Sequence, residues 1–337
     1  MAPFPIYKEQ LAREPDTVFR LAPRGNTTAI LAQLRADMEF ARNQTGIPGM
    51  SVAVIHKGKL IFVEGFGKRN KKDPFTPEAF TVTTVGELIV EGKLDWDTTP
   101  VNTYLPEFET IDPVVTSQLT SKDLLSLRTL AVGTADVRNL IKRIRYVEVK
   151  SKLGVLTNYN NIMYCVVGEA AAKVAGIPFT KLVRNKVLKP LGLSNTGFSM
   201  SEMAKKPNFA VPFQAASHED AVADRFTELP LDGASDLSTA AGDILSEGMV
   251  DGKQVLSKAG IAATLTSKTV YAGYVRHPDF APLAQYIMGW VLNQYKGNNI
   301  FEQGGYHFGY VTNLALFQNA ELVVAHVINA GTTGLPM

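Results

Sequence analysis

The residue pair that would carry out covalent acyl chemistry, a serine with a lysine three residues later, is missing from this chain. On a helix the two side chains would lie on one face, one turn apart, with the amine close enough to take the hydroxyl proton. No lysine in the sequence has a serine at that spacing before it, and the hydroxyls of Thr81, Thr83 and Thr84 have no lysine three residues later either. We therefore expect no activated hydroxyl nucleophile of this kind.

Two other short segments combine polar and small residues. Tyr159-Asn160-Asn161 comes directly before an apolar helical run; taken alone, an asparagine here would cap the helix and the tyrosine would pack. Gln303-Gly304-Gly305 places two glycines together, which permits another backbone to come close. The histidines are scattered, none pairs with another at metal-ligand spacing, and no glycine-rich phosphate loop occurs. The sequence predicts no metal site and no cofactor.

The elements that must position these segments change in type along the chain. A helical period over residues 27–43 is followed by two β-rich runs, 49–55 and 60–67, on either side of a turn with Gly58 at its tip. Three more strand-like runs follow far downstream: Ile287 to Leu292, Asn313 to Phe317 and Leu322 to Ile328. Because both chain ends supply strands, we expect an α/β (α+β) fold whose antiparallel sheet is built from both termini and flanked by helices.

The chain is expected to divide into a sheet region and a mostly helical insertion. We assign residues 1–24 to an N-terminal extension, 25–78 and 285–337 to the sheet region, and 79–284 to the helical region. In the helical region, one apolar helix ends at Gly92, and Ile162 to Ala175 forms another. The first of these starts poorly, because residues 81–84 are all β-branched.

The composition and net charge of the chain exclude several classes of function. The 337 residues are 45% hydrophobic and 20% charged, enough for a large core, and the net charge of +2 gives no field that would attract nucleic acid. The single Cys165 excludes an internal disulfide and fits a small buried side chain better than a reactive thiol. No run approaches the roughly 18 apolar residues of a membrane span, and no signal-peptide pattern opens the chain. We expect a cytoplasmic protein that binds neither nucleic acid nor membrane.

Six segments, in their order and spacing, resemble the β-lactamase-related serine hydrolases. This family includes class C β-lactamases, D-alanyl-D-alanine carboxypeptidases, family VIII esterases and fungal acyltransferases. The segments are Ile47 to Val54, Gly86 to Asp95, Tyr104 to Phe108, Tyr159 to Asn161, Pro190 to Leu193 and Leu237 to Asp243. The resemblance covers roughly residues 25 to 335. It implies an antiparallel sheet packed with helices, a mostly helical insertion, and an active site in the groove between them.

The resemblance also implies roles for the two polar segments. Tyr159 would relay a proton, and the Asn161 amide would hold the substrate carbonyl. Gln303, Gly304 and Gly305 fit a triplet of lysine or histidine, any residue, and glycine on a sheet-edge strand, whose backbone pairs with the substrate and supplies one oxyanion-hole N–H. The implied ligand is a small molecule with an acyl, ester or peptide-like group.

The chain departs from the family pattern at its chemical centre. Phe75 and Glu78 occupy the positions of the serine and the lysine. Gln303 is neutral where the family has an ionisable group, and His307 either substitutes for it or is a structural histidine. Removing a nucleophile costs orders of magnitude in rate even where the binding surface persists.

Two further departures lie in the groove wall. Leu127 stands where a loop histidine is usual, and the segment after Asp243 is short. Since well-preserved sequence borders each departure, excised segments explain them better than gradual drift, whether through a wrong exon assignment or a repurposed gene. We predict a serine hydrolase or acyltransferase homologue whose activity is doubtful, with a ligand-binding pseudoenzyme or a partner-binding scaffold as alternatives.

Overall fold

The computed structural model describes residues 27–67, 78–126, 141–146, 161–193, 196, 198, 214–215, 221–222, 249–250, 253–265, 269–271, 279–280, 284–307 and 310–330. The N-terminal extension, Phe75, Leu127, Tyr159 and the short segment after Asp243 lie outside these residues. Glu78, Asn161 and His307 are described by their backbone alone.

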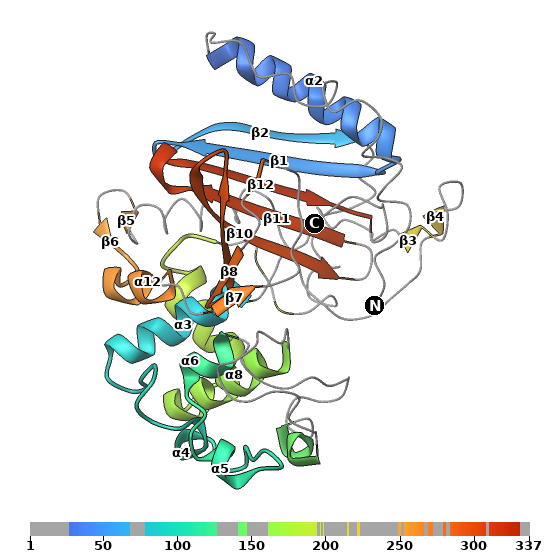
Figure 1. Ribbon diagram of the computed structural model, residues 1–337. Helices are drawn as coiled ribbons and strands as arrows, with labels where there is room; N and C mark the ends of the chain where they lie inside the picture. The colour runs from blue at the N-terminus through green and yellow to red at the C-terminus, as the bar shows by residue number, and fades with distance from the viewer. Residues whose placement is uncertain are drawn as a thin grey trace.

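An eight-stranded antiparallel sheet is built from strands near both ends of the chain (Figure 1). Its strand order is β2-β1-β12-β11-β10-β9-β8-β7. The strands are β1 (Gly49–His56), β2 (Lys59–Gly67), β7 (Thr269–Tyr271), β8 (Ala284–Ile287), β9 (Trp290–Tyr295), β10 (Asn298–His307), β11 (Tyr310–Phe317) and β12 (Leu322–Ile328). The expected α/β (α+β) class, with an antiparallel sheet from both termini, is confirmed.

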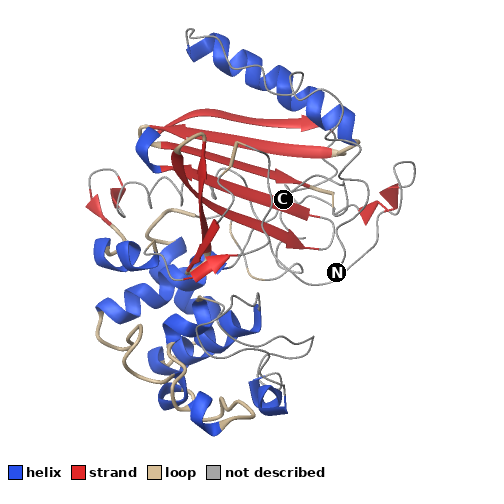
Figure 2. Cartoon of the chain, in the orientation of Figure 1, coloured by secondary structure: helices blue, strands red, loops and turns tan. Residues whose placement is uncertain are grey.

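Most helices gather on one side of the sheet, while α2 lies apart along the β2 end (Figure 2). The α-helices are α2 (Thr27–Thr45), α3 (Glu78–Val90), α4 (Val101–Tyr104), α5 (Pro113–Thr116), α6 (Ser121–Leu125), α8 (Asn161–Ala175), α9 (Phe179–Val183) and α12 (Lys258–Thr264). Shorter turns are η1 (Ile144–Tyr146), η2 (Arg184–Leu188) and η3 (Gln318–Ala320), and two small strand pairs join β3 (Gln214–Ala215) to β4 (Ala221–Val222) and β5 (Met249–Val250) to β6 (Lys253–Gln254). The helices expected over 27–43 and 162–175 correspond to α2 and α8.

The first hairpin forms as the sequence predicts. Lys57 and Gly58, between β1 and β2, both have positive φ, at 51° and 70°. Two consecutive residues in this region are what a tight hairpin turn with the right-handed twist of the strands requires. The strand patterns on either side therefore pair as β1 and β2.

The sequence interpretation of the later strands needs correction. The run from Ile287 to Leu292 is not one strand: β8 ends at Ile287 and β9 begins at Trp290, with a turn between them. Gly289 makes this turn possible, with φ at 75°, but Met288 beside it is buried and apolar, so the segment resembles a continuous strand. The sheet also gains β7 from within the interval that we expected to be mostly helical.

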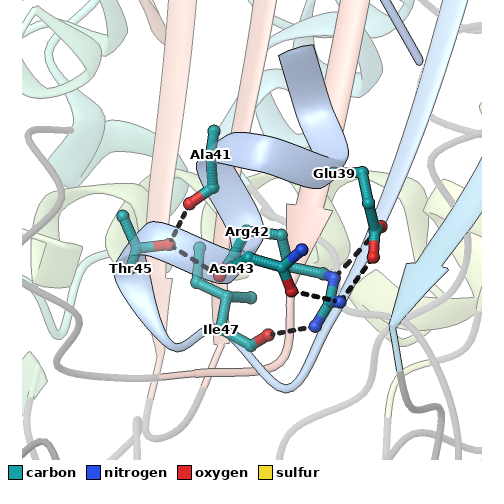
Figure 3. A network of polar contacts seen from close by, with 6 residues as sticks. All are labelled: Glu39, Ala41, Arg42, Asn43, Thr45 and Ile47. Carbon is teal, nitrogen blue, oxygen red and sulfur yellow. Dashed lines mark hydrogen bonds and ion pairs between the residues drawn. The ribbon is translucent and has the colours of Figure 1, made fainter. Parts of the chain in front are cut away.

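Polar contacts at its C-terminal end fix α2 to the start of β1 (Figure 3). Arg42 donates from Nη2 to Glu39 at 2.6 Å and from Nη1 to the Ile47 carbonyl at 3.2 Å. The Thr45 hydroxyl donates to the Ala41 carbonyl at 2.7 Å. The hydrogen bond from Arg42 lowers the pKa of Glu39 below its ordinary value. These contacts hold the helix end while its apolar side packs on the β1–β2 face: Leu31, Leu34, Met38, Val52, Val54, Phe62 and Phe66.

Two large apolar clusters lie on either side of the junction between sheet and helices. One covers the sheet: Ile55, Ile287, Trp290, Phe301, Leu314, Leu316, Val323 and Ala325. The other fills the helical region with side chains from α3, α6 and α8, and it also contains Tyr286 and Met288. Because these two residues come from β8 and its turn, this end of the sheet is packed directly against the helices.

The apolar helix α8 is a core element. Its side chains Met163, Val166 and Val167 are completely buried. In the part of the chain that the structure describes, no single helix is long and apolar enough to cross a membrane, and only the pair Ile162–Ala175 and Phe179–Leu188, bent by 77°, reaches that length and composition together.

Candidate active site

Helix α3, on which the resemblance expects the serine and the lysine, carries neither in its described sequence. It begins at Glu78 and contains no lysine, and the first lysine after it, Lys93, forms an ion pair with Glu91 at 3.0 Å. Thr81 is 5% exposed and Thr84 is fully buried. The Thr84 hydroxyl has no hydrogen-bond partner among the described residues. A hydroxyl without a base beside it is not an activated nucleophile.

The C-terminal half of α3 is nevertheless firmly held. The N–H of Gly92 donates to the Ile89 carbonyl and that of Lys93 to the Leu88 carbonyl, both at 2.9 Å, which is the hydrogen-bond pattern of a Schellman cap. Gly92 has φ at 70°, as such a cap requires, and the helix end predicted there is confirmed. Leu88 is completely buried.

A second helix fixes the orientation of α3. The Glu87 carboxylate accepts a hydrogen bond of 2.6 Å from the backbone N–H of Ser257, the N-cap residue of α12. One residue earlier, a Cβ built on Gly86 would lie 3.5 Å from the Cα of Gly260. Two glycines facing each other allow the helix backbones to approach closely, so α3 and α12 pack as a pair.

The glycine pair of the second polar segment lies on β10 where that strand has one open edge. On one side, β10 pairs with β11 through Gln303, Gly304 and Gly305 as far as His307. On the other side, its pairing with β9 covers only Asn298 to Glu302. At Gly304 and Gly305, no described strand pairs with this second edge of β10, which is the arrangement that an extended ligand needs in order to add to a sheet.

Gln303 itself does not project freely from this edge. Its side chain is buried, at 6% exposed, and its Nε2 lies 3.4 Å from the carbonyl oxygen of Gly304, next to it in the strand. Gly304 is exposed and Gly305 half-buried. The position that the family pattern gives to a cation therefore holds a neutral, largely buried amide.

The start of α8 is tied to the sheet near this edge by two tyrosines. The Tyr164 hydroxyl donates to the Leu125 carbonyl at 2.7 Å and lies 2.9 Å from the Tyr286 hydroxyl. Asn161, one turn before Tyr164, is the first residue of α8. Sequence reasoning missed this pair; the one available signal was a tyrosine on the buried face of a helix, whose hydroxyl needs a partner.

Strand register connects this anchor to the glycine pair. Tyr286 pairs with Val291, and Val291 pairs with Glu302, the residue before Gln303. Neighbouring strands lie about 4.8 Å apart, so the backbones of Tyr286 and Glu302 are separated by about 10 Å. The structure thus brings the first turn of α8 and Gln303 into one region, while Tyr159 lies outside the described residues.

The described side chains that lie beside Gly304 on the two neighbouring strands carry no charge at neutral pH. Asn313 pairs with Gly304 on one side and with His326 of β12 on the other. Burial lowers the pKa of His326 to about 4, so its imidazole is uncharged at pH 7. Within the described ranges, no group of three or more His, Cys, Asp or Glu residues could hold a metal ion.

Comparison with known proteins identifies the same fold and family. The family model described as Beta-lactamase matches residues 28–335. Among curated proteins, an unguisins hydrolase of Aspergillus campestris is 25% identical over 325 residues, covering 85% of this chain and 59% of the relative. A β-lactamase of Pseudomonas fluorescens is 29% identical over 197 residues, covering 52% of each chain. The chain thus spans between half and three fifths of the length of these relatives.

Solved structures agree on the architecture. The octameric penicillin-binding protein homologue from Pyrococcus abyssi superposes with a TM-score of 0.76 at 19% identity, covering 91% of this chain and 74% of that one. A class C β-lactamase gives a TM-score of 0.72 at 15% identity, covering 92% and 94%. At these identities the likeness establishes the fold alone.

Proposed function

Because the chain belongs to the β-lactamase family, a family of serine hydrolases, we propose that in its present sequence it binds an acyl ligand without forming an acyl-enzyme. The ligand is a small molecule with an amide, ester or peptide-like group, held along the open edge of β10. The single observation that carries the proposal is that, in the part of the chain that the structure describes, strand pairing on one side of β10 ends at Glu302, just before Gly304 and Gly305.

The open edge supports binding in a direct physical way. An extended ligand that adds to a sheet edge gains main-chain hydrogen bonds, and glycines let its backbone lie close to the strand. Asn161 at the start of α8 supplies an amide for a ligand carbonyl, and Tyr159 two residues earlier completes the expected polar set. A cytoplasmic location remains part of this proposal.

The absence of a nucleophile supports binding over turnover. Acyl transfer by this family's route needs a hydroxyl that becomes covalently attached, and neither Phe75 nor Glu78 can supply one with its base. The amide of Gln303 also does not gain or lose a proton near neutral pH, so it cannot act as a general acid or base.

Hydrolase or acyltransferase activity is the second candidate, and the packing of α3 favours it. The Schellman end of this helix and its contact with α12 are retained right up to the segment in which the serine and lysine are missing. A hydrolase whose transcript carries further residues between Glu78 and Ala79 would have this pattern. Sequencing the transcript across that junction tests it, and uninterrupted reads that match the present sequence would eliminate it. A partner-binding scaffold is less favoured, because the polar segments are retained.

Binding is tested with a matched pair of small ligands. N-acetylphenylalanine amide, in its D and L forms, presents a neutral amide, and N-acetylphenylalanine presents a carboxylate on the same frame. We expect saturable binding of the amide by titration calorimetry, weaker binding of the acid, and amide NMR shifts at Gly304 and Gly305 but not at Gly65 on β2. Absence of binding, or shifts away from β10, would refute the proposal.

A further inference from the structure

Two tyrosine hydroxyls connect the helical half of the candidate site to its sheet half. Tyr164, one turn into α8, donates to the Leu125 carbonyl at 2.7 Å and lies 2.9 Å from the hydroxyl of Tyr286 on β8. A tyrosine hydroxyl has a single proton to donate. Since Tyr164 gives its proton to Leu125, both contacts are made only when Tyr286 donates to Tyr164. The two hydrogen bonds therefore run in one direction, from β8 through α8 to the end of α6.

These hydrogen bonds lie in an apolar environment. Tyr164 is 6% exposed and Tyr286 3%, and both belong to the apolar cluster of the helical region. Apolar contacts around the two rings have no preferred direction, whereas a hydrogen bond fixes a distance and an angle. Away from water such a bond is also stronger. The tyrosine pair thus sets the position of α8 relative to β8 more sharply than packing alone does.

The two tyrosines lie on elements that carry different parts of the expected ligand site. Asn161, whose amide we propose for a ligand carbonyl, is one turn before Tyr164 on α8. Tyr286 is two strands from the segment with Gly304 and Gly305, because only β9 lies between β8 and β10. Figure 1 shows α8 below β7 and β8, at this end of the sheet. The contact between the tyrosines therefore joins the helix that begins at Asn161 to the sheet that carries the open edge.

We propose that Tyr164 and Tyr286 are positioning residues, whose hydrogen bond holds the start of α8 at a fixed separation from the open edge of β10 so that one ligand contacts both. This inference rests on the proposed function, since it concerns the same ligand. A ligand that adds to the strand edge and offers a carbonyl to α8 binds more tightly when the separation is fixed, because the protein then loses less freedom on binding. The ligand class is therefore an acylated amide long enough to span both elements.

Tyr286→Phe is the sharpest test, because it removes the bond between the tyrosines and keeps the ring. Tyr164 still donates to the Leu125 carbonyl in this variant. Tyr104→Phe is the matched control, since it removes a tyrosine hydroxyl that donates to Asp95 at 3.0 Å within the helical region. Each variant is titrated with the more tightly bound enantiomer of N-acetylphenylalanine amide. Amide NMR shifts on binding and the melting temperature without ligand are also measured.

We expect Tyr286→Phe to lower affinity about three- to tenfold, up to the worth of one hydrogen bond. Ligand-induced shifts at Gly304 and Gly305 should remain, whereas those in the first turn of α8 should shrink. Tyr104→Phe should lower the melting temperature to a similar extent and leave affinity unchanged. Tyr164→Phe breaks the same bond from the other side, so the double variant with Tyr286→Phe should lose little more affinity than Tyr164→Phe alone.

Three results would refute the positioning role and leave the proposed function standing. Tyr286→Phe could bind as tightly as the unmodified protein. Tyr104→Phe could lose as much affinity as Tyr286→Phe, which would assign the loss to stability alone. The losses of Tyr164→Phe and Tyr286→Phe could add in full, which would show that the two hydroxyls act separately. If the unmodified protein binds no ligand, the proposed function fails and this role fails with it.

Discussion

Helix α3 and strand β10 carry the two halves of the candidate site, and they retain different things. α3 retains its packing: Leu88 is completely buried, the helix ends in a Schellman cap, and Glu87 binds the start of α12. β10 retains an edge at Gly304 and Gly305 with which no strand in the described ranges pairs. The difference shows that packing and chemistry depend on different positions: α3 is held in the core although the helix contains neither a serine nor a lysine.

The largest expected effect tests whether α3 is retained for packing. Leu88→Ala removes a fully buried side chain and should lower the free energy of unfolding by about 3 to 4 kcal/mol. Val90→Ala, on the same helix but 54% exposed, should change it by less than about 0.5 kcal/mol. Urea unfolding followed by circular dichroism measures both. Equal, small effects would mean that α3 does not support the core.

The next effect concerns His326, which pairs with Asn313, the neighbour of Gly304 in the sheet. The pKa of His326 is about 4 in the folded protein, against 6.5 for an unperturbed histidine, so below pH 6.5 the unfolded chain binds a proton more readily than the folded one. Stability should therefore be highest above pH 6.5 and fall by up to about 3 kcal/mol as the pH drops to 4.

The control for this pH dependence is His326→Gln, which removes the titrating group. Denaturant unfolding at pH 7.5 and pH 4.5 should show a clearly smaller difference in this variant than in the unmodified protein. An unchanged difference would assign the acid sensitivity to other groups and would contradict the lowered pKa of His326.

The smallest expected effect tests the open edge directly. Gly304→Val places a branched side chain where a ligand backbone should approach, and we expect about a tenfold loss of affinity for N-acetylphenylalanine amide, or about 1.4 kcal/mol. Folding should be little affected, because among the described residues the nearest atom to an added Cβ is the Thr312 carbonyl oxygen at 3.9 Å. Gly65→Val, on β2 at the far end of the sheet, should leave affinity unchanged. Equal losses in the two variants would remove the argument for β10.

Much of the fold could be predicted from local sequence. The helical periods gave α2, α3 and α8, and the glycine at the tip gave the β1–β2 hairpin, because in each case the signal lies in consecutive residues. The turn between β8 and β9 was missed because buried Met288 continues the apolar pattern through it. β7 was missed because a strand of three residues carries too little pattern.

Only part of the candidate site could be predicted, because only part of it is encoded in consecutive residues. Only the family resemblance placed Gln303, Gly304 and Gly305 on a strand, since no strand pattern was predicted there, and the open edge follows from where β9 begins, which is a tertiary property. The link between Tyr164 and Tyr286 joins residues 122 positions apart, so it cannot be derived from local spacing.

Intact-mass spectrometry of the protein without bound ligand, after incubation with reagents that acylate or phosphonylate a serine nucleophile, tests the central claim most directly. The protein is first shown by calorimetry to bind N-acetylphenylalanine amide, and a fresh sample without this ligand is then incubated separately with a fluorophosphonate and with benzylpenicillin. Binding without any increase in mass is the predicted result, because the retained strand edge can hold a ligand and no hydroxyl is activated to attack it. A stoichiometric adduct with either reagent would reveal a working nucleophile and contradict the account.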